Sequence, residues 1–411
     1  MSNVLDEAVA TTLEEAVSAD RVDQLPVSVP VARRGSSPHD QPRRGLLRTL
    51  YDTCSRTVTL GTRKLVEKVL LRRQAERFYL VFGGHLFFQT LRAAAQFDLF
   101  TLLDREGALT RGQIAEKLGI QEQPARILLL GLTSCRFLKK RGPQYSITRL
   151  SRELLSRDSR NNVLAYIELQ HEGMYKAMPH LYESILKYEN VGLCEFSGDE
   201  PTFYERLAHT PDLQKVFQDA MSELSVQTNE LLARFIDLSD VSHLVDVGGG
   251  DGTNILTLSE RFPHLRATVF DLPSVCEIAR ANIANHQQSD RLDVVAGHCF
   301  RDDFPEDADC FLFSHFFTIW SAEKDRLLLK KCYDALPTGG RVMIFNMMQH
   351  DDETGPLSAA VGSPYFLTLA TGEGMLYTWA EYENWMRETG FSEVERHVLP
   401  RDHGIIVGVK R

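Results

Sequence analysis

The stretch Leu244-Val245-Asp246-Val247-Gly248-Gly249-Gly250-Asp251-Gly252-Thr253-Asn254 decides the fold of this chain of 411 residues. Its first apolar residues are typical of a strand buried on both faces, and Ile255, Leu256 and Leu258 continue at helical spacing. Gly248, Gly250 and Gly252 permit backbone angles that other residues rarely adopt, and they let a ligand approach the main chain. The stretch therefore predicts a strand, a glycine turn and a helix that together bind a small molecule.

The spacing of these glycines argues against a dinucleotide as the ligand. The G-x-G-x-x-G fingerprint needs a third glycine at the position where this chain has Thr253. A second strand, 268–270, ends at Asp271, whose carboxylate can accept hydrogen bonds from both hydroxyls of a ribose. The combination favours a nucleoside cofactor other than NAD or FAD, and a purely structural turn is the alternative.

Composition excludes several other classes of protein. With 43% hydrophobic and 25% charged residues the chain is globular, and its net charge of -10 argues against a surface for duplex nucleic acid. The seven cysteines form no C-x-x-C pair, as expected for free thiols in a reducing compartment, and we expect no metal site. Neither a signal peptide nor an apolar run of transmembrane length is evident. We therefore expect a cytoplasmic protein without a membrane partner.

The chain divides into four segments by its patterns. Residues 1–45, rich in Ala, Val, Ser, Pro and Arg, indicate a disordered basic arm. Residues 46–160 indicate an all-helical winged-helix domain for dimerisation, and residues 161–240 indicate long linking helices. In residues 241–411 strands alternate with helices, which predicts an α/β domain with a doubly wound, mostly parallel sheet.

The amino-terminal domain carries a pattern that usually suggests DNA binding. After an apolar helix over 86–103, two short helices at 110–119 and 123–132 precede a hairpin that turns at Gly142-Pro143. The second short helix has few cations, and its side chains suit burial against protein: Ile127, Leu128, Leu129, Leu130 and Leu132. We therefore favour a homodimer built on this domain over a nucleic-acid partner.

Two groups of residues are expected to form one ligand pocket. The carboxyl ends of parallel strands meet at one edge of a sheet, so Gly248, Asp271, the turn 297–300, Ser314 and Asn346 should converge on one cleft. The linking helices offer aromatic and sulfur side chains, which usually form core but could also line the pocket of an organic molecule: Tyr166, Met174, Phe217 and Met221. His171 and Glu172, beside them, are expected to form a surface pair.

Residues 80–411 resemble the bacterial and plant family of winged-helix O-methyltransferases that use S-adenosylmethionine. The resemblance is carried by 245–252, Asp271-Leu272-Pro273, Gly297-His298-Cys299-Phe300, Trp320 and 336–342. It implies a homodimer interlocked through the amino-terminal domain, a small methyl acceptor and the cofactor S-adenosylmethionine. The implied cofactor residues are Gly248, Gly250, Gly252, Asp271, Leu272, His298, Cys299, Phe300 and Ser314, and the implied acceptor pocket adds Thr318 and Trp320.

The chain departs from the family pattern where the chemistry would occur. His298 replaces the aspartate that would contact adenine, Thr318 replaces the general-base histidine, and Leu376-Tyr377-Thr378 stands where the family has Glu-Arg-Thr. Methyl transfer can proceed largely by proximity and alignment, although a positioned base typically adds about 10² to 10⁴-fold. His315, near the sheet's carboxyl edge, is the best substitute base, and a buried structural histidine is the alternative.

Three classes of function follow. The first is a methyltransferase of a small aromatic or polyketide-like metabolite, with oxygen as the favoured acceptor atom. Carbon or nitrogen is the alternative, because the missing base suits a nucleophile that is already electron-rich. A binding protein without turnover and a winged-helix regulator are the other two classes, and the regulator would need a cationic recognition helix that residues 123–132 do not provide.

Overall fold

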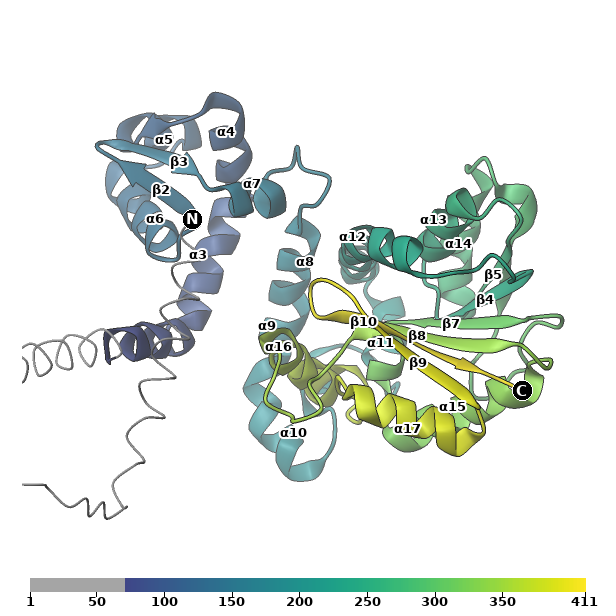
Figure 1. Ribbon diagram of the computed structural model, residues 1–411. Helices are drawn as coiled ribbons and strands as arrows, with labels where there is room; N and C mark the ends of the chain where they lie inside the picture. The colour runs from purple at the N-terminus through teal and green to yellow at the C-terminus, as the bar shows by residue number, and fades with distance from the viewer. Residues whose placement is uncertain (1–70) are drawn as a thin grey trace, which may run out of the picture. The chain divides into compact units, whose positions relative to one another are not determined.

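A computed structural model describes residues 71–411 of the chain (Figure 1). Residues 71–81 are helical and belong with the amino-terminal segment, whereas residues 82–411 form a unit of their own. The arm predicted at 1–45 and residues 46–70 of the segment predicted over 46–160 lie outside the described residues. The elements around the candidate site all belong to the second unit.

The amino-terminal part of this unit has the predicted winged-helix pattern. Its helices surround a small antiparallel sheet with the strand order β1-β3-β2. The domain therefore contains strands as well as the helices that were expected. The elements are α3 Gly84–Gln96, α4 Leu99–Glu106, β1 Leu109–Thr110, α5 Arg111–Leu118, α6 Glu122–Ser134, β2 Leu138–Arg141, β3 Gln144–Ile147 and α7 Arg149–Leu155.

Local signals explain where the two short helices begin and end. The Thr110 hydroxyl accepts a hydrogen bond from the Gln113 amide, and the Gln113 side chain bonds back to Thr110, which together make a capping box for α5. Gly119 ends the same helix with a φ of 65°, a left-handed angle that glycine adopts without strain. The predicted boundaries of this helix are therefore confirmed.

The single helix predicted over 86–103 is wrong, because the chain breaks between α3 and α4. Asp98 adopts a left-handed φ of 53°, and its carboxylate accepts a hydrogen bond from the Thr101 hydroxyl at 2.5 Å. The break turns α4 so that Leu99 and Leu103 are fully buried in the same core as Leu129 of α6. Tertiary packing overrides the local helical periodicity here.

The linking segment is helical from residue 164 to residue 187, as predicted, but it changes pitch. It consists of α8 Leu164–Leu169, a π-helix Gln170–Met174, α9 Tyr175–Ala177, a 3-10 helix Met178–His180 and α10 Leu181–Lys187. α12 Pro211–Phe235 begins at a proline, which suits the first turn of a helix. It follows a 3-10 helix Val191–Glu195, α11 Phe203–Arg206 and a 3-10 helix Leu207–His209. Within residues 71–411 no helix combines the length and the apolar character needed to cross a membrane.

The carboxy-terminal part contains a seven-stranded sheet of order β6-β5-β4-β7-β8-β10-β9. The first five strands of this order are parallel, and β10 runs antiparallel to β8 and β9. The doubly wound, mostly parallel sheet is therefore confirmed. The strands are β4 His243–Val247, β5 Arg266–Asp271, β6 Leu292–Ala296, β7 Cys310–Ser314, β8 Arg341–Met347, β9 Glu393–Val398 and β10 His403–Val409.

Helices cover both faces of this sheet (Figure 1). One core cluster joins β4 to α15 and α17 through Val245, Leu328 and Trp385, and a second joins it to α13 and α14 through Leu244, Ile255 and Cys276. Each fully buried aliphatic side chain contributes roughly 1.5–3 kcal/mol to this packing. The helices are α13 Thr253–Arg261, α14 Pro273–Ala284, α15 Ala322–Ala335, α16 Leu357–Tyr365, which continues as a π-helix Phe366–Ala370, and α17 Trp379–Thr389.

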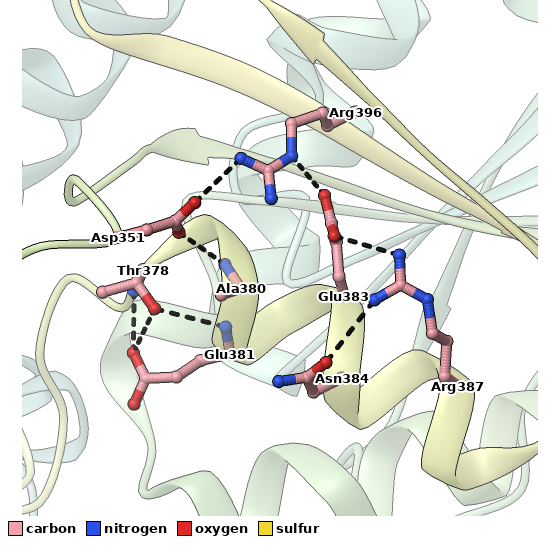
Figure 2. Close-up of polar contacts among 8 residues, drawn as sticks. All are labelled: Asp351, Thr378, Ala380, Glu381, Glu383, Asn384, Arg387 and Arg396. Atoms are coloured by element: carbon pink, nitrogen blue, oxygen red, sulfur yellow. Dashed lines mark hydrogen bonds and ion pairs between the residues drawn. The ribbon is translucent and has the colours of Figure 1, made fainter.

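Polar contacts hold α17 against β9 (Figure 2). Thr378 and Glu381 form a second capping box at the start of the helix. On β9, the Arg396 guanidinium binds the carboxylates of both Asp351 and Glu383. The hydrogen bond from Arg396 lowers the pKa of the largely buried Glu383 carboxyl. The ion pairs thereby fix the helix that covers the antiparallel edge of the sheet.

Candidate active site

A cavity of about 1240 Å³ lies at the carboxyl ends of the parallel strands. The strand order reverses between β4 and β7, and ligands of doubly wound sheets bind at such a point. The cavity is lined from the sheet by the segments that follow β4, β5, β6, β7 and β8, and from above by the linking helices and α16. The two groups of residues that were expected to form one pocket are therefore brought together.

The glycine turn after β4 allows a ligand to approach the main chain. Gly248 has a φ of 73°, and its amide donates to the Phe270 carbonyl at 2.8 Å. A Cβ atom at Gly248 would lie 2.2 Å from the Phe316 ring, so a side chain cannot be accommodated without moving that ring. Gly250, with a φ of 58°, lines the cavity, whereas Gly252 lies behind the turn against Ile283 and forms the N-cap of α13. Only the first two glycines of the predicted trio thus face the ligand space.

Asp271, the last residue of β5, points its carboxylate at the glycine turn. One carboxylate oxygen accepts a hydrogen bond from the Gly250 amide at 2.9 Å, and the other accepts one from the Leu272 amide at 2.7 Å. Burial raises the pKa of the Asp271 carboxyl, and these two amide bonds oppose the rise. A carboxylate has about four acceptor sites, so two remain for the hydroxyls of a ribose. The site fits a nucleoside cofactor with an unoccluded backbone approach.

The turn after β6 presents a histidine with a defined tautomer. The Phe300 amide donates to His298 Nδ1 at 3.3 Å, so Nδ1 is the unprotonated nitrogen and Nε2 carries the hydrogen. The His298 amide donates to the Asp302 carboxylate at 2.8 Å, which holds the turn in place. His298 can therefore donate to an acceptor nitrogen of adenine, where an aspartate would accept from the amino group. Cys299, buried behind it, also lines the cavity.

Trp320, which was expected to line the acceptor pocket, lines the cavity beside the turn after β6. Its ring packs edge-on against Phe300 with a centroid distance of 4.9 Å, and the Lys324 ammonium lies 4.9 Å from the Trp320 ring centroid. Lys324 also forms an ion pair with Glu373, and all four side chains line the cavity. A paired cation, Lys324, thus closes one end of this side of the cavity. We call this side the glycine wall, and define it as Gly248, Gly250, Asp271, Leu272, His298, Cys299, Phe300 and Trp320.

The opposite side of the cavity is aromatic and carries few charges. Its side chains come from the linking helices and α16. We call this side the aromatic wall, and define it as Tyr166, Met174, Tyr204, Phe217, Met221 and Tyr365. The Tyr204 and Tyr365 hydroxyls are 3.3 Å apart, and burial raises the pKa of both phenols, which keeps them neutral donors and acceptors. Tyr365 was missed in the sequence because α16 has no polar periodicity that marks a pocket.

His315 and His403 lie together at the carboxyl end of β7 and the start of β10. Their ring centroids are 5.2 Å apart, and both side chains line the cavity. His315 has a φ of 54° and a buried Nε2 without a partner among the described residues. Burial, together with the His403 ring, lowers the pKa of His315 to about 3. His315 is therefore a neutral hydrogen-bond acceptor and a weak base.

His403 was not anticipated from the sequence, because it lies in the hairpin between β9 and β10. Arg401 and Asp402 both have φ near 60°, and the His403 amide donates to the Pro400 carbonyl at 3.5 Å, as in a turn of type I′. His403 Nδ1 lies 2.7 Å from the Arg401 carbonyl, so Nδ1 carries the hydrogen and Nε2 is the acceptor. The sequence signal that could have indicated the position of His403 was the turn Arg401-Asp402, which directly follows Pro400.

The remaining expected residues also have clear positions. Thr318 and Ser314 line the cavity, and the Thr318 hydroxyl donates to the His315 carbonyl at 3.4 Å. His171 Nε2 lies 3.9 Å from the Glu172 carboxylate, which is the surface pair expected, while His171 also bonds with Gln89 at 3.1 Å and Glu172 also pairs with Lys176 at 2.9 Å.

Asp246 lies two residues before Gly248, and its buried carboxyl has a raised pKa. Its side chain is fully buried in β4, where one oxygen accepts from the Asn254 amide at 3.0 Å and the other has no partner among the described residues. Burial raises the pKa of Asp246 to about 7, and the nearby Asp271 carboxylate contributes to this rise. The glycine wall therefore rests on a group whose charge changes in the physiological range of pH.

Comparisons with known proteins agree with this geometry. Residues 184–392 match the family model of the O-methyltransferase domain, and residues 79–157 match that of the O-methyltransferase dimerisation domain. The chain is 35% identical over 336 residues to L-tyrosine C(3)-methyltransferase of Streptomyces lavendulae, a match that covers 81% of this chain and 92% of that protein. It is 33% identical over 324 residues to 3-hydroxy-5-methyl-1-naphthoate 3-O-methyltransferase of Streptomyces sahachiroi, a match that covers 78% of this chain and 91% of that protein.

A solved structure adds the same conclusion at the level of the fold. The S-adenosylmethionine-dependent methyltransferase SibL, in its apo form, superimposes with a TM-score of 0.71 at 34% sequence identity. The alignment covers 81% of this chain and 98% of that chain. With a matching domain over half of its length and relatives above 30% identity, the chain belongs to the family of S-adenosylmethionine-dependent O-methyltransferases.

Proposed function

We propose that this enzyme transfers a methyl group to a hydroxyl oxygen of a small aromatic or polyketide-like metabolite. The observation that carries the proposal is one cavity with two unlike sides, a glycine wall with a single carboxylate and an aromatic wall of neutral phenols. Such a lining suits a flat organic acceptor better than a phosphorylated one, because the aromatic wall offers neutral side chains and Lys324 is already paired with Glu373. The 3-O-methyltransferase relative acts on a naphthoate, which is an acceptor of this kind.

The residues divide the work as follows. When bound, S-adenosylmethionine supplies an electrophilic methyl group. Asp271 would hold the ribose, the backbone of the turn at Gly248 and Gly250 would lie against the cofactor, and His298 would donate to adenine. The aromatic wall excludes water and aligns the acceptor, and alignment alone can contribute several kcal/mol to catalysis. His315 accepts a hydrogen bond from the reacting hydroxyl through its free Nε2.

Methylation at an aromatic carbon is a second candidate, and a specific observation favours it. Thr318 occupies the position of the family's general base, and the lowered pKa of His315 makes that imidazole a poor proton acceptor. An electron-rich ring carbon depends less on a base in the transfer step. The relative named as an L-tyrosine C(3)-methyltransferase shares 35% identity with this chain, so methylation of carbon occurs among similar proteins.

The test is incubation of the purified full chain with isotopically labelled cofactor and three acceptor samples. The samples are L-tyrosine, a hydroxynaphthoate and a crude metabolite extract, and each labelled product is analysed by mass spectrometry and NMR. A methoxy product supports oxygen transfer, a ring methyl supports carbon transfer, and label in neither position from any sample contradicts the proposal of a small aromatic acceptor.

We also propose a homodimer built on residues 46–160, with linking helices over 161–240 and the catalytic domain over 241–411. The dimerisation-domain match covers 79–157, and α6 exposes Ile127 and Leu130 by about two thirds of their surface, 65% and 67%. Apolar side chains on that helix suit a protein partner rather than phosphates. Light scattering at micromolar concentration should give the mass of a dimer, and a stable monomer or sequence-specific duplex binding at physiological salt would contradict it.

A further inference from the structure

Three side chains with metal-binding atoms converge outside the lining of the cavity. His180 ends the 3-10 helix that precedes α10, and Cys194 and Glu195 end the 3-10 helix Val191–Glu195. His180 Nε2 lies 2.8 Å from Glu195 Oε1 and 3.7 Å from Cys194 Sγ. Within residues 71–411 the three atoms lie within 4.8 Å of one another. A histidine nitrogen is thus faced by a thiol and a carboxylate from an adjacent turn.

The backbone that carries Cys194 and Glu195 is fixed from two sides. A Cβ atom at Gly192 would lie 2.8 Å from both the Ala177 and Thr368 carbonyl oxygens, so the glycine allows the turn to pack directly on α9 and the π-helix Phe366–Ala370. From the other side, the Arg206 guanidinium donates to the carbonyls of Leu193 at 3.0 Å and Phe196 at 2.9 Å. The turn is therefore held next to His180 before any ligand binds.

The distances suit a tetrahedral ion of borderline softness. With Zn–N near 2.0–2.1 Å and Zn–S near 2.3 Å, a tetrahedral site puts nitrogen and sulfur roughly 3.5 Å apart, close to the observed 3.7 Å. The nitrogen and oxygen must separate from 2.8 Å to roughly 3.4 Å, which the half-exposed Glu195 side chain can do by a small rotation. Solvent can supply a fourth ligand, because Cys194 is exposed.

We propose that His180, Cys194 and Glu195 form a binding site for a divalent ion of the Zn²⁺ type. The thiol loses its proton to solvent on binding, and the neutral His180 imidazole carries its single hydrogen on Nδ1, so that the Nε2 lone pair binds the ion. The ion would join the start of α10 to a turn whose Leu193 packs with Leu369 and Phe203, next to the aromatic wall. The expected role is structural, since the site lies outside the reacting centre.

The experiment is a titration of the metal-free full chain with Co²⁺ as a spectroscopic probe, followed by competition with Zn²⁺. The parent should show a thiolate-to-cobalt charge-transfer band and tetrahedral d–d bands that saturate at one equivalent and vanish when one equivalent of Zn²⁺ is added. Cys194→Ser should abolish the charge-transfer band and weaken Zn²⁺ binding by more than about 100-fold, since loss of a ligand exceeds the effect of a second-shell change. Cys135→Ser, at a thiol in the amino-terminal domain, is the matched control and should behave as the parent.

Thermal unfolding provides a second measurement that needs no methyl acceptor. Excess Zn²⁺ should raise the midpoint of the parent and of Cys135→Ser but leave that of Cys194→Ser and Glu195→Gln nearly unchanged, because a ligand stabilises only the state that binds it. The proposal is overturned if Co²⁺ produces no saturable band at micromolar concentration, or if the band persists in Cys194→Ser.

Discussion

The glycine wall and the aromatic wall of the cavity are built by opposite means. The glycine wall uses backbone amides, positive φ angles and one carboxylate at the ends of strands, so its geometry is rigid and its ligand contacts are polar. The aromatic wall uses side chains from helices that include a π-helix at 170–174 and α16, which continues as a second π-helix at 366–370. Helical walls can change by side-chain substitution without altering the sheet.

This difference separates the two roles that we propose for the cavity. In that proposal the glycine wall holds the cofactor and the aromatic wall holds the acceptor. Substitutions in the two walls should therefore affect different steps of the reaction.

The largest effect is expected at the glycine wall from Asp271→Ala. The change removes the acceptor for two ribose hydroxyls, each charge-assisted bond being worth roughly 1.5–3 kcal/mol, so the affinity for S-adenosylmethionine should fall at least about tenfold. Calorimetry with the cofactor and with its demethylated product measures the change. Binding equal to that of the parent would remove Asp271 from the cofactor site.

Asp246→Asn tests how the buried carboxyl next to the glycine wall affects the pH dependence of stability. The folded pKa of about 7 lies above the ordinary value of 3.8, so the native state binds more protons than the unfolded state between these values. The stability of the parent should therefore fall as pH rises from about 4 to about 7, by about 2–4 kcal/mol.

The asparagine variant should lack this fall, because its side chain has no proton to lose. Urea unfolding at pH 5, 7 and 8.5 measures the difference, and the asparagine variant should be the more stable of the two at pH 8.5. Parallel pH profiles for the two proteins would show that Asp246 is ionised at much lower pH.

Phe217→Ala acts on the aromatic wall alone. The Phe217 ring packs edge-on against Tyr204 at 5.8 Å and lines the cavity, so its loss should lower kcat/KM for the acceptor by about 10- to 200-fold while cofactor affinity changes less than about twofold. Steady-state kinetics with the acceptor found by mass analysis and calorimetry with the cofactor separate the two. A fall in cofactor affinity as large as that of kcat/KM would break the division between the walls.

The smallest effect is expected from His315→Gln, which lies between the two walls. Because the pKa of His315 is lowered to about 3, the imidazole stays neutral throughout the range from pH 5 to 8, and the parent rate should show no inflection near 6.5 from this group. Glutamine keeps a hydrogen-bond acceptor, so turnover should fall less than about tenfold.

The contrary result for this variant is equally clear. A loss of about 10² to 10⁴-fold with unchanged cofactor affinity would identify His315 as a general base despite its burial. In that case His403→Gln, which removes the neighbouring ring, serves to separate direct proton transfer from positioning by its effect on the pH profile.

Local signals in the sequence were sufficient for most of the fold. The strand and glycine turn around Gly248, the capping residues Thr110 and Thr378 and the helix start at Pro211 all depend on interactions within a few residues, and the structure has each of them. The break at Asp98 was not predictable in this way, because it depends on how Leu99 and Leu103 meet a distant helix.

The candidate site divides along the same line. Patterns of a few residues by themselves determined the class of fold, the glycine turn, the carboxylate at Asp271 and the departures at His298 and Thr318, because strand ends and turns are encoded locally. Only the tertiary structure brought His403 to His315, placed Trp320 against Phe300 and Tyr365 against Tyr204, and moved Gly252 behind the turn. Those contacts join residues far apart in the chain, and burial at the resulting positions, rather than residue type, sets the pKa values of His315 and Asp246.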